Sequence, residues 1–117
     1  MEDVHVPGSA LVGGEEGRGF RIAMQSLDNG RLSVAGMSVG MGRRALDTAI
    51  RYATERKAFG EAIANFQLIQ AMLADSRTEA YAARCMVLDA AGRRDDGGNV
   101  ATEASCCKLF ASEMVGR

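Results

Sequence analysis

A basic, aromatic corner that ends in glycine is the part of this sequence best suited to hold a phosphate-bearing cofactor. Arg56 is always charged, and its planar guanidinium offers a fork of donors that suits a diphosphate. Phe59 and Gly60 follow, and Gln67 supplies both a hydrogen-bond donor and an acceptor. The alternative for Arg56 is compensation of a helix dipole at a C-terminus. The corner needs no glycine-rich phosphate loop to bind such a cofactor.

A second polar segment, Asp28-Asn29-Gly30-Arg31, could bind a nucleotide. Arg31 can form paired hydrogen bonds with a phosphate or a base edge, and Asp28 can accept from an amino group or a hydroxyl. The alternative is an aspartate favourable to the dipole at the start of a helix, with a solvated arginine nearby.

Composition and charge exclude several classes of protein. The 117 residues are at most one domain, and 47% hydrophobic with 25% charged residues is ordinary for a globular chain. A net charge of -1 offers no basic field for nucleic acid or anionic lipid. No apolar run approaches the roughly 20 residues that span a bilayer, and residues 1–20 do not resemble a signal peptide.

The cysteines and the single histidine argue against a disulfide framework or a metal site. Cys106 and Cys107 are adjacent, which strains a disulfide between them, and Cys85 has no Cys-x-x-Cys partner. We expect buried structural thiols in a reducing compartment. His5 lies in a Val-His-Val alternation, which predicts a side chain at a strand edge.

The periodicity predicts a short strand and a turn-rich loop over 1–19, followed by three helices. The only proline is Pro7, so long uninterrupted helices are permitted after Phe20. Apolar residues at three- and four-residue steps predict helices over about 20–55, loosened near 28–30, and from a cap at Asn65 to about Gly92. The run 93–98 predicts a solvated hairpin loop, and Asn99 then caps the third helix.

Short connections between three long helices predict an all-α fold, an antiparallel up-and-down bundle that a fourth helix would complete. We expect Gly36 and Gly40 to let a neighbouring helix come close, at a cost of up to ~1 kcal/mol of helix propensity each. On the opposite face, ion pairs between Asp47 and Arg51 and between Arg51 and Glu55 are expected in a solvated stripe. The methionines are expected to lie in the core: Met24, Met37, Met41, Met72, Met86 and Met114.

The corner motif and several other segments resemble the acyl-CoA dehydrogenase family, and together they cover essentially the whole chain. Tyrosine, arginine, Phe-Gly and Phe-Gln recur there at the spacing of Tyr52, Arg56, Phe59, Gly60, Phe66 and Gln67. Four further segments fit the family pattern: Val6-Pro7 with the glycines up to Gly19, Leu27 to Arg31, Leu73-Ala74-Asp75 with Glu79 and Arg84, and Lys108 with Ala111-Ser112-Glu113. The resemblance implies that residues 1–19 are a remnant of a middle β-domain. It makes 20–117 an incomplete C-terminal four-helix domain, so that the chain is truncated at both ends.

The resemblance also implies a function, namely the α,β-dehydrogenation of an acyl-CoA thioester by bound FAD. Arg56, Phe59 and Gln67 are the residues implied to contact FAD, on a neighbouring subunit. The segment Asp28, Asn29, Gly30 and Arg31 is implied to lie along the acyl-CoA. No residue here is assigned as the catalytic base. In most of the family the base is a glutamate that would lie beyond Arg117. In a branched-chain minority it occupies the position of Gly30, which cannot take a proton.

The same resemblance implies an electron-transferring flavoprotein as acceptor, a homo-oligomer built as a dimer of dimers, and a cytoplasmic, bacterial location. The chain alone is expected to be inactive. Two alternatives remain open at this point: a non-enzymatic helical interaction module, and another dehydrogenase-like flavoenzyme such as an acyl-CoA oxidase.

Overall fold

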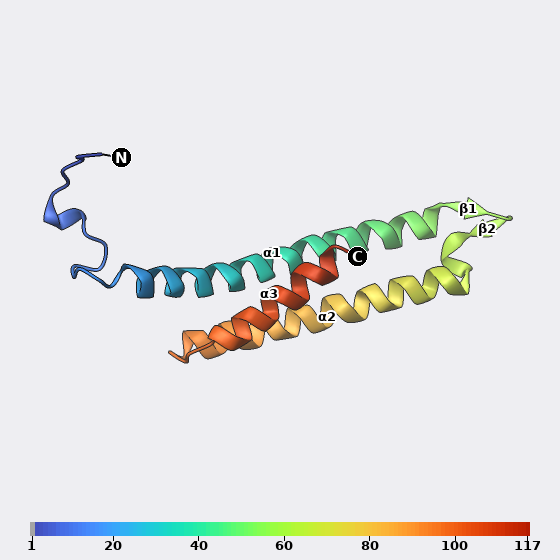
Figure 1. Ribbon diagram of the computed structural model, residues 1–117. Helices are drawn as coiled ribbons and strands as arrows, with labels where there is room; N and C mark the ends of the chain where they lie inside the picture. Colours follow the sequence, from blue (N-terminus) through green and yellow to red (C-terminus); the bar gives the residue numbers. More distant parts are fainter. Residues whose placement is uncertain (1) are drawn as a thin grey trace.

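The computed structural model describes residues 2–117 and confirms an all-α antiparallel bundle (Figure 1). The three helices are α1 (Gly19–Glu55), α2 (Gln67–Asp95) and α3 (Ala101–Val115). Between α1 and α2 lie the strands β1 (Lys57–Ala58) and β2 (Glu61–Ala62) and the 3-10 helix η2 (Ile63–Asn65). Another 3-10 helix, η1 (Gly8–Ala10), lies in the N-terminal segment.

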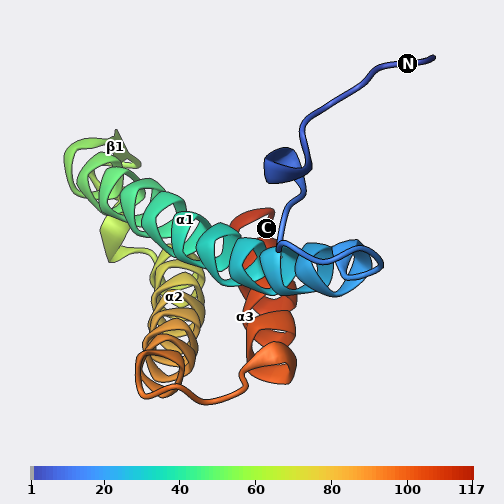
Figure 2. The ribbon, with the colours of Figure 1, turned by 90° about the vertical axis from the view of Figure 1, so that its left-hand side faces the viewer.

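The bundle is long and thin. α2 and α3 lie side by side, and α1 lies across both of them (Figure 2). The extents are 72 × 35 × 16 Å and the radius of gyration is 21.3 Å, against roughly 13 Å for a compact chain of similar length. No large side chain of the described residues is fully buried. The core is built mainly from small side chains, and its buried residues are Ala35, Ala83, Ala90, Cys107, Ala111 and Met114. No described helix has an apolar stretch of the length and hydropathy that a membrane crossing requires.

The N-terminal segment contains no strand within residues 2–18, so the strand predicted around Val4 and Val6 is wrong. A strand needs a hydrogen-bonded neighbour for its backbone groups. Here the segment extends away from the bundle (Figure 1), and Val4, His5 and Val6 are all exposed. Within residues 2–18 no partner strand lies beside these valines. The first helix is also continuous through 28–30, where loosening was expected.

Close approach of two helices occurs at Gly42, and the prediction for Gly36 and Gly40 is wrong within this chain. A Cβ placed at Gly36 or Gly40 would meet nothing within 4 Å. One placed at Gly42 would lie 3.2 Å from both the Sδ and the Cε of Met114 on α3. The absent side chain at Gly42 is therefore what lets α3 pack onto α1.

The ion pairs differ from those expected on α1. Asp47 pairs with Arg43 at 3.9 Å, and among residues 2–117 neither Asp47 nor Glu55 pairs with Arg51. Because a solvated side chain can turn toward either neighbour one helical turn away, spacing alone does not decide the partner. The stripe itself is exposed as predicted.

The ends of α2 also differ from expectation. Asn65 does not cap α2, because it ends η2 and the N-cap position is Phe66. Its Nδ2 donates to Glu61 Oε2 at 2.9 Å. At the other end α2 continues to Asp95, past the predicted end at Gly92. Arg93 stabilises this extra turn by pairing with Asp89 at 2.9 Å. Basic residues in the last turn also favour the helix dipole.

The start of α3 follows the prediction in part, because the N-cap residue is Val100 and Asn99 lies one position before it. The Oδ1 of Asn99 accepts from the backbone N–H of Ala101 at 3.2 Å, and Glu103 lies in the first turn. Glu103 also lies 3.7 Å from Arg93, an ion pair that joins α3 to α2.

Burial of the sulfur-containing residues was overestimated. Met114 is 8% exposed and Met86 is half-buried, but Met37, Met41 and Met72 are each more than 60% exposed, and Met24 is exposed as well. All three cysteines are free thiols, and of these only Cys107 is buried. Three helices in two thin layers have too little interior to cover the apolar side chains that the periodicity assigns to a core.

Candidate functional site

The corner between α1 and α2 is a tight hairpin with an aromatic residue at its tip. β1 and β2 pair antiparallel, with Ala58 opposite Glu61, so Phe59 and Gly60 form a two-residue loop. Both have positive φ, +54° and +91° respectively. Such turns match the twist of a hairpin, and glycine adopts them freely, but for a bulky residue this conformation carries strain. The strained Phe59 is 99% exposed.

The same hairpin brings the predicted cofactor residues to one end of the molecule. Arg56 is the C-cap residue of α1, and its carbonyl accepts from the Ile63 N–H at 2.9 Å, which closes the corner. The rings of Phe59 and Phe66 lie edge to face with centroids 6.3 Å apart. Gln67 follows immediately as the first residue of α2.

The charges at this corner suit an anion. The first turn of α2 contains no acidic residue and no side-chain cap, so its free N–H groups keep the positive end of the helix dipole unopposed. Within residues 2–117, no carboxylate lies within ion-pair distance of exposed Arg56. The diphosphate of a dinucleotide could therefore be held by a guanidinium and a helix N-terminus together.

The predicted substrate segment lies within α1 and not at its start. Asp28 is nine residues past Gly19, so the alternative of a dipole-stabilising aspartate at a helix start does not apply. Asp28 Oδ1 instead accepts from Arg31 Nη1 at 2.5 Å, and both side chains are partly buried.

A cavity of about 360 Å³ lies beside this segment, between α1 and the turn that joins α2 to α3. Asp28 and Asn29 line it from α1, while Arg94 and Asn99 line it from the other side. Sequence reasoning missed Arg94 and Asn99 as site residues, because the run 93–98 was read only as a solvated loop. The Arg93-Arg94 pair was the available signal.

The two predicted sites lie far apart within the chain. Arg31 and Arg56 are separated by 25 helical positions, which is roughly 37 Å along α1 at 1.5 Å per residue. The structure therefore does not bring Arg56, Phe59 and Gln67 together with the segment 28–31. The reactive end of one bound cofactor therefore cannot contact both sites of the same chain.

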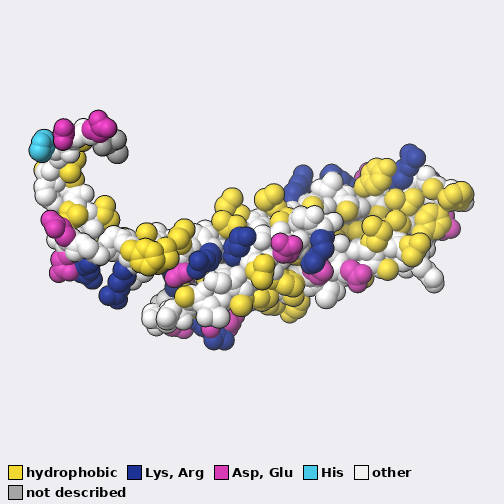
Figure 3. All heavy atoms as spheres, in the orientation of Figure 1, with side chains coloured by type: hydrophobic (Ala, Val, Ile, Leu, Met, Phe, Trp, Pro, Cys, Tyr) yellow, Lys and Arg dark blue, Asp and Glu magenta, His cyan; other side chains and the backbone are white. Residues whose placement is uncertain are grey.

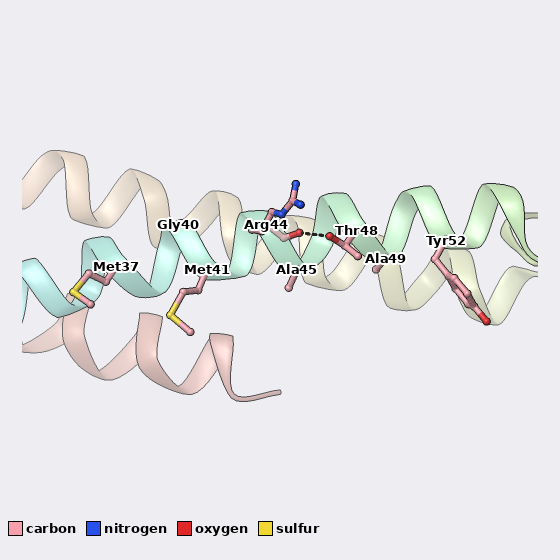
Figure 4. A pocket seen from close by; sticks show the side chains of 8 residues that line it. All are labelled: Met37, Gly40, Met41, Arg44, Ala45, Thr48, Ala49 and Tyr52. Carbon is pink, nitrogen blue, oxygen red and sulfur yellow. Dashed lines mark hydrogen bonds between the residues drawn. The ribbon is translucent and has the colours of Figure 1, made fainter.

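A third feature is an apolar face on α1, lined by the residues labelled in Figure 4. It is a broad, shallow depression of about 1000 Å³. Met37, Met41 and Tyr52 supply its large side chains, and Gly40 leaves its backbone open. Thr48 turns its hydroxyl inward to the Arg44 carbonyl at 2.9 Å, which removes a polar group from the face. Apolar side chains also gather over the hairpin end of the molecule (Figure 3).

Comparisons with known proteins identify the family of the chain. The family model described as acyl-CoA dehydrogenase, C-terminal domain, matches residues 17–117. A caffeyl-CoA reductase–Etf complex subunit CarC from Acetobacterium woodii is 49% identical over 97% of this chain and 30% of its own length. The probable acyl-CoA dehydrogenase YngJ from Bacillus subtilis is 46% identical over 100% of this chain and 30% of its own length.

A solved structure gives the same assignment. Butyryl-CoA dehydrogenase from Megasphaera elsdenii matches with a TM-score of 0.84 and 39% identity, over 86% of this chain and 26% of that one. The chain thus spans about 30% of the length of the curated relatives it matches. On the matched residues, the identity and the shared fold, the chain belongs to the acyl-CoA dehydrogenase family and corresponds to its C-terminal helical domain.

Proposed function

We propose that this chain is the C-terminal helical part of a flavin-dependent acyl-CoA dehydrogenase. The observation that carries the proposal is the corner between α1 and α2, where Arg56 pairs with no carboxylate of residues 2–117 and the N-terminus of α2 has no side-chain cap. In this assignment residues 1–19 are the end of the middle domain and 20–117 belong to the C-terminal domain.

The cofactor is FAD, with Arg56 and Gln67 at its diphosphate and adenosine. Exposed Phe59 offers a flat face to the adenine, and the strain at its φ of +54° is consistent with a residue held out for a contact. FAD held by these residues would supply the hydride-accepting chemistry of the dehydrogenation, and the protein would supply binding and orientation. The flavin belongs to a neighbouring subunit, which accounts for the distance between the two sites.

The substrate is an acyl-CoA thioester, with Asp28, Asn29, Gly30 and Arg31 along its CoA portion. The cavity beside Asp28 adds Arg94 to this set, and an arginine there offers a second donor fork to the nucleotide end. Gly30 offers no base, so no residue of this chain is assigned to proton abstraction.

The enzyme is a homo-oligomer, a dimer of dimers, and the apolar face of α1 is a surface through which it assembles. Exposure of Met37 and Met41 to water is unfavourable, and Gly40 between them leaves room for a helix of another chain to pack against this face (Figure 4). An electron-transferring flavoprotein reoxidises the flavin, a partner class supported by the CarC relative, itself a subunit of an Etf complex. Three free thiols suit a reducing compartment, and we place the enzyme in the cytoplasm.

A second candidate is the reverse reaction, reduction of a 2-enoyl-CoA. The 49%-identical CarC relative is a caffeyl-CoA reductase subunit. The proposed binding residues serve both directions equally, because the same FAD and the same CoA are held. Assaying the complete enzyme with acyl-CoA plus a dye acceptor, and with enoyl-CoA plus a reduced flavoprotein, distinguishes them.

The corner is tested by Arg56→Ala in the complete enzyme, with Arg51→Ala as the control. Arg51 is also an exposed arginine of α1 without an ion pair among the described residues, so both variants lose one positive charge. Loss of a charged hydrogen-bond partner of ~1.5–3 kcal/mol predicts FAD affinity weakened about 10- to 150-fold in Arg56→Ala alone. Flavin absorbance after gel filtration measures it. Stoichiometric FAD in Arg56→Ala would reject the assignment.

A further inference from the structure

Three arginines converge on a groove between α1 and α2 that belongs to neither proposed site. The groove is open to solvent and has a volume of about 360 Å³. It is lined by Val39, Arg43, Leu46 and Asp47 of α1 and by Arg77, Ala80, Tyr81 and Arg84 of α2. No residue of α3 or of the hairpin lines it. Its size falls within the range of small-molecule sites, roughly 300–1000 Å³.

The helical spacing is what places these side chains together. Arg77, Tyr81 and Arg84 are four and three residues apart, so they share one face of α2. The two arginines are separated by two turns, about 10.5 Å along the axis. Antiparallel α1 places Arg43 on the facing wall of the same groove.

The charge in the groove is unbalanced. Within residues 2–117 neither Arg77 nor Arg84 has a carboxylate within ion-pair distance. Arg43 has only Asp47, at 3.9 Å, which is too long for a good hydrogen bond. Three arginines and one aspartate line the groove, so their formal charges sum to +2.

We propose that this groove, which we call the arginine groove, binds a small organic phosphate. A phosphate monoester carries close to two negative charges and several acceptor oxygens, which matches two unpaired guanidinium forks and the Tyr81 hydroxyl. Bridging Arg77 and Arg84 of α2 to Arg43 of α1, it relieves the repulsion across the groove. The inference does not depend on the proposed dehydrogenase activity.

The lining determines the organic part of the ligand. Val39, Leu46 and Ala80 are the remaining groove residues, and all three are apolar and at least half-buried. Inorganic phosphate would leave this surface uncovered. A monoester with a short apolar group covers it and gains the corresponding hydrophobic contribution.

The test is a titration of the 117-residue chain, followed by amide chemical shifts, with inorganic phosphate and with phenyl phosphate. Sodium chloride keeps the ionic strength constant, so general screening does not change along the titration. We expect saturable shifts in 39–47 and 77–84, with phenyl phosphate binding at least about fivefold more tightly than phosphate. Equal affinities would reject the organic ligand, and shifts that do not saturate would reject the site.

Arg77→Gln and Arg84→Gln are the variants, and Arg51→Gln is the matched control with the same change in charge. Each groove variant should weaken phenyl phosphate binding by about tenfold, and the control by less than about twofold. An equal effect of Arg51→Gln would mean that net charge alone attracts the ligand, which overturns the proposal. Circular dichroism checks that each variant is helical, and the titration of the unaltered chain decides the question on its own if one variant misfolds.

Discussion

Met114 on α3 packs directly over Gly42 on α1, with its sulfur and its methyl group 3.2 Å from the place a Cβ would occupy. Met114 is 8% exposed, so this contact belongs to the small core that joins the two helices. Gly36 and Gly40 on the same helix have no such neighbour. The three glycines therefore offer an internal comparison of close packing with open surface.

The glycine comparison gives the first prediction. Gly42→Leu should destabilise the chain by ~1–3 kcal/mol, because the added side chain must displace Met114 from between the helices. Gly36→Ala should raise stability by up to ~1 kcal/mol, because alanine favours the helix and meets open space. Urea unfolding followed by circular dichroism measures both. A Gly42→Leu chain as stable as the original would show that α3 does not depend on this contact.

The exposed methionines of α1 give the second prediction, about self-association. Met37→Lys together with Met41→Lys should reduce association of the chain, because the apolar face loses its two largest aliphatic side chains. Analytical ultracentrifugation over a tenfold concentration range is the measurement. Leu88→Lys with Leu109→Lys is the control, since both leucines are exposed but lie outside this face. If the control pair disrupts association equally, the α1 face is not the surface responsible.

The Asp28–Arg31 ion pair gives the third prediction, about substrate binding in the complete enzyme. Arg31→Ala should raise KM for acyl-CoA more than it lowers kcat, because a contact remote from the reacting carbons contributes equally to ground and transition states. Arg21→Ala removes a charge from an exposed position of the same helix and should change neither constant. Steady-state kinetics with several chain lengths provide the readout. If KM is unchanged for every acyl chain length, Arg31 does not contact the substrate and only pairs with Asp28.

The buried thiol gives the fourth prediction, about alkaline pH. Burial, with a smaller contribution from neighbouring Cys106, raises the pKa of Cys107 above its ordinary value of 9.0. The folded state thus holds this proton more tightly than the unfolded state does. The corresponding stability is fully present below pH 9.0 and is lost as the pH rises through the folded pKa. Cys107→Ala should flatten this alkaline loss, as measured by urea unfolding from pH 7 to 10.5.

The thiols also differ in reactivity at neutral pH. Exposed Cys85 and Cys106 should react with an aromatic disulfide reagent more than about tenfold faster than buried Cys107. Three equal rates would mean that α3 separates from the bundle faster than the reagent attacks.

The sequence predicted the three helices well, because their signals are local. Apolar periodicity located α1 to within one residue of its ends, Asn99 was placed one position before the N-cap of α3, and Gly60 marked the corner. The family motif at Arg56 and Gln67 could also be recognised in the sequence, since it is defined only by residue types and their spacing. Where a prediction depended on one side chain choosing among several solvated partners, as for Asn65 and Arg51, it was wrong.

What the sequence determined by itself is the helical character, the family and the residue types of the two candidate sites. What only the tertiary structure decided is which of these residues meet. Helix periodicity assigns every apolar residue to a face of its helix, but it does not say which faces are covered by another helix. Met37 and Met41 were therefore predicted to lie in the core, and they lie exposed. Nor does periodicity fix the distance between residues of different helices. The packing of the helices places Arg94 and Asp28 at one cavity and places Arg43, Arg77 and Arg84 around one groove. The length of α1 separates Arg31 from Arg56. The physical reason is that periodicity is a property of each helix alone, whereas the contacts depend on how antiparallel helices pack and where each one ends.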